Sequence, residues 1–102
     1  MSPTQRTIKV LKEDGWSVAI VEYWNPFARR RVDLFGFIDI LALKGDETLA
    51  LQVTSGTNVS ARVKKITDHA NIAAVRDAGW RVEVWGWRKL KSGWSPKIVD
   101  LS

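Results

Sequence analysis

Residues 36–55 have the sequence GFIDILALKGDETLALQVTS, in which two apolar runs flank the polar turn KGDE. Ile, Leu, Val and Ala dominate both runs, and the Gly-Asp pair between them is typical of a tight connection between strands. We therefore expect strands over residues 32–43 and 48–54, joined as a hairpin at the centre of the fold.

The residues before this hairpin predict a helix and one further strand. Ser2 fits a helix N-cap, with Pro3 at the first helical position and Gln5 placed as in a capping box. The helix should end near Asp14, because Gly15 suits the position after the last turn. Residues 16–24, WSVAIVEYW, are β-branched and aromatic, which predicts a strand that leads into a basic turn.

The residues after the hairpin predict a second helix and two strands. Beyond residue 57 the apolar period changes from two to about 3.6, which predicts a helix over 58–78 that ends at Gly79; its apolar stripe would be Val59, Val63, Ile66, Ala70 and Ala73. Residues 80–88 alternate as a strand, and 96–101 form a short edge strand because Pro96 cannot donate to a ladder. The order α-β-β-β-α-β-β predicts a single α/β domain over residues 1–102, with a central mixed sheet of about five strands flanked by two helices.

Composition excludes several classes of protein. Hydrophobic residues make up 45% of the chain and charged residues 26%, which is typical of a globular domain. The sequence has no long apolar run and no signal-peptide pattern, so we expect a cytoplasmic protein with no membrane partner. With no Cys and one His, thiolate chemistry and zinc sites are improbable, and any catalysis must use carboxylates, amides, hydroxyls, Lys or Arg. The net charge of +5 suits a polyanionic partner.

Two polar residues interrupt the central strands. Strand periodicity puts Asp39 on one face with Phe37 and Leu41, and puts Gln52 on one face with Ala50. A carboxylate or an amide buried without a partner is costly. Either residue alone is readily explained as a strand-end group bonded to backbone, whereas the pair on adjacent strands favours a functional site.

At these residues the chain resembles the PD-(D/E)XK nuclease superfamily, which includes Holliday junction resolvases and restriction-type endonucleases. Residues 36–39 resemble the family's G-x-x-D strand, and residues 52–54 fall where the family has (D/E)-x-K. The element order is also similar. The resemblance implies a restriction-endonuclease-like fold and hydrolysis of DNA that depends on Mg²⁺, or on Mn²⁺. The metal ligands would be Asp39, the Gln52 side chain and the Val53 backbone carbonyl, with Thr54 and Ser55 positioning phosphate or water.

Two departures from the family pattern shape the remaining candidates. Gln52 replaces the usual acid, and Thr54 stands where the catalytic Lys belongs. Arg62 or Lys65 on the second predicted helix would supply the missing cation. A second carboxylate would come from Glu22, our preferred extra ligand, or from Asp33. Gln5 lies in the first helix, where family members often carry a Glu. Each has an ordinary alternative: an edge-facing strand residue for Glu22, a turn residue or an ion pair to the Arg run for Asp33, and a helix cap for Gln5.

Basic residues predict where a nucleic acid would bind. Arg29, Arg30 and Arg31 form a compact cluster suited to phosphate contacts. On the second predicted helix, Arg62, Lys65, His69 and Arg76 share a basic flank that favours phosphate contacts. The residues expected to bind nucleic acid there are Ser55, Arg62, Lys64, Lys65 and His69. The expected partner is DNA, including branched DNA, in a prokaryotic cell or a phage-infected host.

Two further readings concern assembly and the class of activity. Trp85 and Trp87 share a strand face that would be covered by the first helix or by a second copy, so a homodimer through Trp85, Trp87 and Trp94 is one hypothesis. The α-β-β-β-α order also resembles the double-stranded RNA-binding domain, for which Arg62, Lys64 and Lys65 would contact RNA. The alternatives to an endonuclease are thus such an RNA-binding module and a catalytically silent nuclease fold.

Overall fold

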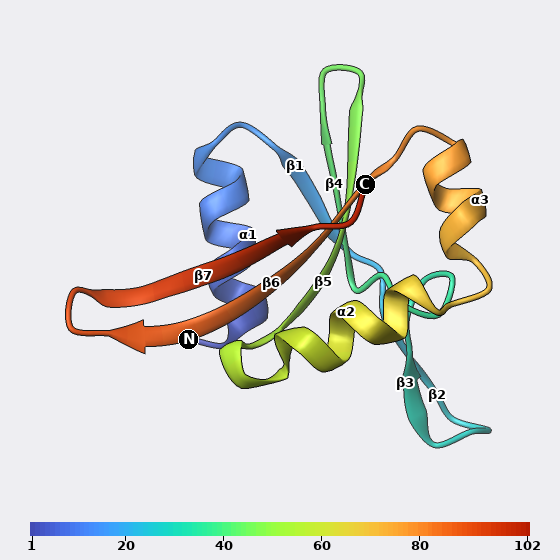
Figure 1. The fold of residues 1–102 in the computed structure, drawn as a ribbon, viewed down its shortest axis with the longest axis horizontal. Coiled ribbons are helices and arrows are strands. Elements are labelled where there is room, and N and C mark those ends of the chain that lie inside the picture. The colour runs from blue at the N-terminus through green and yellow to red at the C-terminus, as the bar shows by residue number, and fades with distance from the viewer.

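The fold is built on a mixed five-stranded sheet with the strand order β1-β4-β5-β6-β7, described for all residues 1–102 by a computed structural model (Figure 1). Only β5 and β6 run parallel, and every other neighbouring pair is antiparallel. The strands are β1 (Ser17–Ile20), β4 (Ile40–Lys44), β5 (Glu47–Ser55), β6 (Arg81–Leu90) and β7 (Gly93–Asp100). A separate two-stranded hairpin, β2 (Tyr23–Asn25) and β3 (Arg30–Val32), extends away from this sheet.

Helices cover both faces of the sheet. Helix α1 (Pro3–Glu13) packs on one face, and α2 (Val59–Thr67) and α3 (Ile72–Asp77) pack on the other. A short 3₁₀ turn, η1 (Gly56–Asn58), leads from β5 into α2. The chain is therefore a single α/β domain with a mixed central sheet, as the sequence predicts. No helix is long and apolar enough to cross a membrane.

The first helix forms as its sequence predicts. The backbone N–H of Gln5 donates to the Ser2 hydroxyl at 3.1 Å, and the backbone N–H of Ser2 donates to the Gln5 side-chain carbonyl at 3.0 Å. These two bonds satisfy N–H groups that the helix leaves unpaired at its start. Gly15 follows with a φ of 90°, a left-handed conformation that glycine adopts at little cost.

The prediction of an unbroken strand over residues 16–24 is wrong, as is that of one over 32–43. The first is divided between β1 and β2, and the second is divided between β3 and β4, with a loop over residues 33–39. The last contact between the two segments in the main sheet is the Val21 N–H, which donates to the Asp39 carbonyl at 3.0 Å. The residues between these two points leave the sheet together and pair with each other as β2 and β3.

The prediction of one helix over residues 58–78 is also wrong, because the helix breaks after Thr67. His69 leaves the helical path and packs edge-on against Phe37, with ring centroids 5.3 Å apart. Its Nδ1 accepts the Asn71 N–H at 3.1 Å, and the Asn71 amide donates to the Phe35 carbonyl at 3.0 Å. The break shifts the apolar stripe, so that Ile72 and Val75 are buried while Ala70 and Ala73, which the unbroken helix would bury, are exposed.

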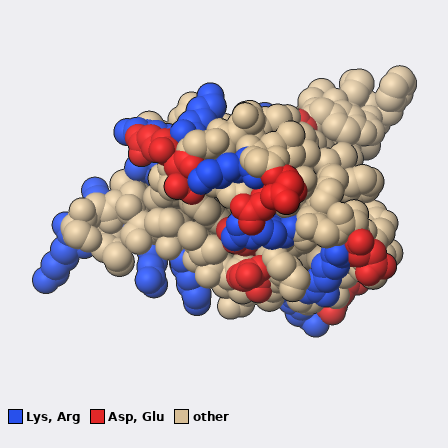
Figure 2. All heavy atoms as spheres, turned by 90° about the horizontal axis from the view of Figure 1, so that it is seen from above, with Lys and Arg blue, Asp and Glu red and all other residues tan.

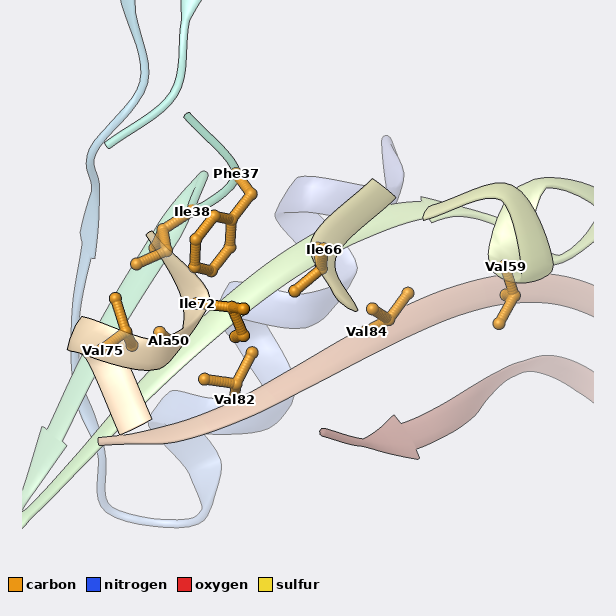
Figure 3. Packing of buried hydrophobic residues seen from close by; sticks show 9 residues of the cluster. All are labelled: Phe37, Ile38, Ala50, Val59, Ile66, Ile72, Val75, Val82 and Val84. Atoms are coloured by element: carbon orange, nitrogen blue, oxygen red, sulfur yellow. The ribbon is translucent and has the colours of Figure 1, made fainter. Parts of the chain in front are cut away.

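Two separate hydrophobic clusters hold the layers together. The cluster under α2 and α3 consists of Phe37, Ile38, Ala50, Val59, Ile66, Ile72, Val75, Val82 and Val84 (Figure 3). The cluster under α1 consists of Leu11, Trp16, Ile40, Ala42, Leu49, Leu51, Trp85 and Trp87. Successive strand residues point to opposite faces, and Leu51 and Val53 pack with the α1 cluster, so the Gln52 side chain lies on the α2 side. Asp39, which precedes Ile40 of the α1 cluster, lies on the same side and contacts Gln52.

Candidate active site

Asp39 lies at the start of β4, where the loop over residues 33–39 rejoins the sheet. Its N–H donates to the Leu51 carbonyl at 3.0 Å, which extends the pairing of β4 with β5 by one residue. Its Oδ2 accepts two hydrogen bonds from β5, one from the Val53 N–H at 3.0 Å and one from the Gln52 amide at 3.4 Å. The structure therefore brings Asp39, Gln52 and Val53 together.

Gln52 links Asp39 to a second acid and to a cation from α2. Its Nε2 also donates to Asp33 Oδ2 at 3.3 Å. The Lys65 Nζ lies 3.8 Å from the same Asp33 oxygen. The Asp33 carbonyl also accepts the Gly36 N–H at 3.0 Å, so Asp33 begins a turn, as one of its alternatives expected, but its carboxylate does not pair with the neighbouring Arg run. Lys65 is the predicted helix cation that reaches the site.

Two buried oxygens of this cluster accept no hydrogen bond. Asp39 Oδ1 and Gln52 Oε1 are the buried side-chain polar atoms without a partner. Such groups are rare in native proteins because leaving one unpaired costs about 1–3 kcal/mol. Both atoms are oxygens with free lone pairs, and hard divalent cations prefer oxygen ligands of this kind. The residues present therefore fit Mg²⁺ or Mn²⁺.

The electrostatics of Asp39 follow from its burial. Desolvation raises the pKa of the Asp39 carboxyl to about 7, while the Val53 N–H and the Gln52 amide lower that pKa and the charges of Asp33 and Glu22 raise it further. A nearby cation would reverse the effect by favouring the ionised form. No group of three or more His, Cys, Asp or Glu side chains lies close enough to hold a metal ion. A cation here would therefore depend on the Gln52 amide and on backbone oxygens as well as on Asp39.

The remaining predicted metal and catalytic residues lie around this cluster. Glu22 follows β1 and pairs with Arg31 at 3.4 Å, with 24% of its side chain exposed. Thr54 is buried next to Gln52 along β5, whereas Ser55 is exposed and contacts Thr57 and Asn58. Gln5 lies in the capping box of α1, which confirms its reading as a cap.

The predicted basic flank of the second helix is only partly assembled. Arg62 is half-buried on α2 and makes no ion pair, and Lys64 pairs with Asp68 at 3.2 Å. The helix break removes His69 from the flank, and His69 instead lies over Gly36, where an added Cβ would clash with its Nε2. Arg76 is on α3, where its Nε donates to the Leu101 carbonyl at 2.8 Å. The prediction that His69 and Arg76 share a flank with Lys65 is therefore wrong.

The arginine cluster lies next to the site. Arg29 is at the turn of the β2–β3 hairpin, and Arg30 and Arg31 are on β3, so the cluster is not confined to a loop. A depression of about 240 Å³ joins the hairpin to the Asp39 cluster, with a lining of Arg30, Arg31, Val32, Asp33, Gly36 and Lys65. Positive side chains from the hairpin and from α2 thus face one polar depression.

A second basic region was missed in the sequence. The β6–β7 hairpin extends from the opposite side of the sheet (Figure 1) and carries exposed cations at Arg88, Lys89, Lys91 and Lys97. In Figure 2 the end of the molecule that corresponds to this hairpin shows Lys and Arg side chains alone, whereas both signs of charge mix elsewhere on that face. The signal in the sequence for this region is the group of cations Arg88, Lys89 and Lys91 at and just after the end of the strand predicted over residues 80–88.

The tryptophans of β6 do not form a free surface. Trp85 and Trp87 are 6% and 5% exposed, and the Trp87 Nε1–H donates to the Thr7 hydroxyl on α1 at 2.8 Å. Helix α1 covers this face, as one of the two readings expected. The prediction that Trp85 and Trp87 mediate self-association is therefore wrong. Trp94 is 47% exposed and lies under the Arg6 guanidinium.

No model of a known protein family matches the chain, and no curated protein matches its sequence. Functional assignment therefore rests on the residues of the site.

Proposed function

We propose that this protein is a metal-dependent DNA endonuclease of the restriction-endonuclease-like, resolvase-like type. The observation that carries the proposal is the pair of buried oxygens, Asp39 Oδ1 and Gln52 Oε1, which accept no hydrogen bond. Gln52 connects them to Asp33, which contacts Lys65 and lines the polar depression. Buried acceptors without donors are costly, so a site that keeps two of them indicates a ligand that supplies positive charge.

The residues that would hold Mg²⁺ or Mn²⁺ are Asp39, Gln52 and Val53. Since the N–H and C=O of one strand residue point to the same side, the Val53 carbonyl faces the edge of β5 on which its N–H meets Asp39. Glu22 adds negative charge near Asp39. When bound, the cation would stabilise the charge that develops on a phosphodiester and generate a hydroxide nucleophile at neutral pH.

Lys65 supports this function from α2. It lies 3.8 Å from Asp33, which in turn accepts from Gln52, so its ammonium group is tethered to the same cluster as Asp39. A positioned cation stabilises the negative charge of a phosphoryl transition state. Lys65 would therefore replace the Lys that the family has at the position of Thr54, with Arg62 one turn earlier on the same helix as the alternative.

Binding of the DNA backbone would use cations on both sides of the site. Arg30, Arg31 and Lys65 line the depression beside Asp39, and the exposed cations of the β6–β7 hairpin lie at the opposite end of the sheet. Contacts of this kind are independent of sequence and weaken steeply with salt. With the β2–β3 hairpin set aside, the order of helices and strands is also consistent with a nuclease fold.

The test is cleavage of end-labelled DNA by the purified protein. A four-way junction, a linear duplex and a single strand are each incubated with Mg²⁺, with Mn²⁺ or with chelator. We expect cleavage only with metal, and we expect Asp39→Ala to abolish it while salt-dependent binding persists. Cleavage retained in Asp39→Ala would overturn the assignment.

A second candidate is a catalytically silent nucleic-acid-binding protein on the same fold. It is favoured by Thr54 at the usual Lys position and by the absence of a cluster of three metal-binding side chains. Binding without cleavage under every metal condition would support this candidate. Preference for double-stranded RNA, unaffected by metal, would support an RNA-binding module instead.

A further inference from the structure

The β2–β3 hairpin exposes three large aromatic side chains to solvent. Tyr23 and Trp24 are each 58% exposed, and Phe27 at the turn is 97% exposed. The hairpin extends away from the main sheet, so neither hydrophobic cluster covers these rings (Figure 1). Aromatic side chains concentrated on one exposed element indicate a surface that contacts a partner.

Local hydrogen bonds hold the turn of this hairpin in one conformation. The Asn25 side-chain oxygen accepts the N–H of Phe27 at 3.0 Å and that of Ala28 at 3.1 Å. Pro26 fixes one backbone torsion between these points, and Arg29 closes the turn with a φ of 52°. Phe27 is therefore presented at the end of an ordered turn.

The charge of the hairpin identifies the chemistry of the partner. Residues 23–32 contain Arg29, Arg30 and Arg31 and no acidic residue. Trp24 pairs with Arg31 across the two strands, so a ring and a guanidinium share one face. Positive charge beside stacking rings matches a nucleic acid strand with exposed bases, because the guanidinium groups contact phosphates and the rings contact base faces.

The hairpin is also continuous with the candidate active site. Glu22 comes directly before β2 and Asp33 directly after β3. The negative charges of both acids raise the pKa of Asp39. The depression that Arg30 and Arg31 share with Asp33 and Lys65 connects the two regions. A DNA strand bound at Asp39 would therefore pass along the base of the hairpin.

We propose that the β2–β3 hairpin selects DNA that contains unpaired bases, with Phe27 stacking on an exposed base while Arg29, Arg30 and Arg31 contact the adjacent phosphates. The inference rests on the proposed function, because it takes DNA to be the ligand. It deepens that function by naming the substrate class: bulged, branched or single-stranded DNA in preference to continuous duplex.

The test compares binding of two DNA probes in chelator, so that cleavage plays no part. One probe is a fully paired duplex, and the other carries a single unpaired 2-aminopurine, whose fluorescence falls when an aromatic ring stacks on it. Wild-type protein should bind the bulged probe more tightly and quench it. Phe27→Ala should weaken binding to the bulged probe about 5- to 100-fold and abolish quenching, with less than about a twofold change for the duplex.

Two further variants complete the design. Trp94→Ala removes an exposed ring from the β6–β7 hairpin and should leave the preference for the bulged probe unchanged. Replacement of Arg29, Arg30 and Arg31 by Ala should weaken binding to both probes and reduce the salt dependence.

Equal loss of affinity for both probes in Phe27→Ala, or no loss, would overturn the inference. Loss of vesicle binding or of self-association in that variant, with DNA preference intact, would also overturn it and would assign the hairpin to a membrane or to a second copy. Failure of the protein to cleave any DNA, with the Phe27-dependent preference retained, would overturn the proposed endonuclease function alone.

Discussion

Two carboxylates are almost equally buried on opposite faces of the sheet, Asp39 at 8% exposed and Glu83 at 7%. Glu83 lies on the α1 face, where its Oε2 accepts from Arg81 at 3.0 Å and its Oε1 accepts from the Trp85 indole at 2.9 Å. Asp39 lies on the α2 face and accepts only through Oδ2, while its Oδ1 has no donor.

The same contrast extends to the other buried polar groups of each face. On the α1 face the Thr7 hydroxyl donates to the Pro3 carbonyl at 2.9 Å and accepts from Trp87. On the α2 face the Gln52 carbonyl accepts nothing. The buried polar groups described on the α1 face thus have hydrogen-bond partners, whereas two acceptors on the α2 face have none and are free to bind a ligand. Burial alone does not separate Asp39 from Glu83, but their hydrogen-bond partners do.

Replacing the cation of the α2 face should slow DNA cleavage strongly. We expect Lys65→Ala to lower the rate of metal-dependent DNA cleavage by about 10²–10³-fold, because a positioned cation is lost from the site. Single-turnover cleavage by wild type and variant measures the effect. Lys9→Ala, an exposed lysine on α1, is the matched control and should cleave at the wild-type rate. Normal cleavage by Lys65→Ala together with slow cleavage by Arg62→Ala would transfer the role to Arg62.

Replacing the acid of the α2 face should increase stability. Burial raises the pKa of Asp39 from 3.8 to about 7, so the folded state favours the protonated acid. The stability from this group is fully present below about pH 4 and is lost as the pH rises through about 7. In chelator, Asp39→Asn should therefore match wild type near pH 4 and exceed it at pH 8 by about 2–4 kcal/mol.

Urea unfolding of both proteins across this pH range measures the difference. A constant difference at all pH values would show that Asp39 does not titrate as its burial requires. The same variant should lose cleavage, so that stability and activity change in opposite directions.

Replacing the acid of the α1 face should have the smallest effect and the opposite sign. Glu83→Gln keeps the shape of the side chain but replaces one of its two acceptor oxygens with an NH₂ group. An NH₂ facing the Arg81 guanidinium cannot accept its hydrogen bond, which should lower the free energy of unfolding by about 1–3 kcal/mol. Thermal and urea unfolding measure this loss, and DNA cleavage should be unchanged. Increased stability in Glu83→Gln would show that the two faces do not differ in the way their hydrogen bonds indicate.

Much of the fold and part of the site were predictable because their signals are local. The Ser2 and Gln5 cap, the hairpin turn after Lys44 and the edge strand that contains Pro96 each depend on residues close together in the chain. The sequence also indicated Asp39 and Gln52 as a polar pair on adjacent strands, because each interrupts an apolar run, and the pairing of β4 with β5 brings the two side chains into contact.

The predictions of secondary structure are wrong where contacts between distant residues override the local preference. Residues 16–24 have a strong strand propensity throughout, yet β1 ends where Val21 bonds to Asp39. The helical period continues past Thr67, yet the helix breaks where His69 packs on Phe37. Neither partner could be identified from the residues around the break.

The cap of α1, the turn after Lys44, the class of the fold and the position of Asp39 and Gln52 within their strands could be read from the chain, because they follow from backbone geometry within a few residues. The acid and the cation that join Asp39 and Gln52 depend on tertiary packing. Asp33 meets Gln52 across 19 residues, and Lys65 reaches the same oxygen from a different element. Such encounters depend on how the layers pack, and the packing also leaves two oxygens of the site without donors, which no local pattern in the chain encodes.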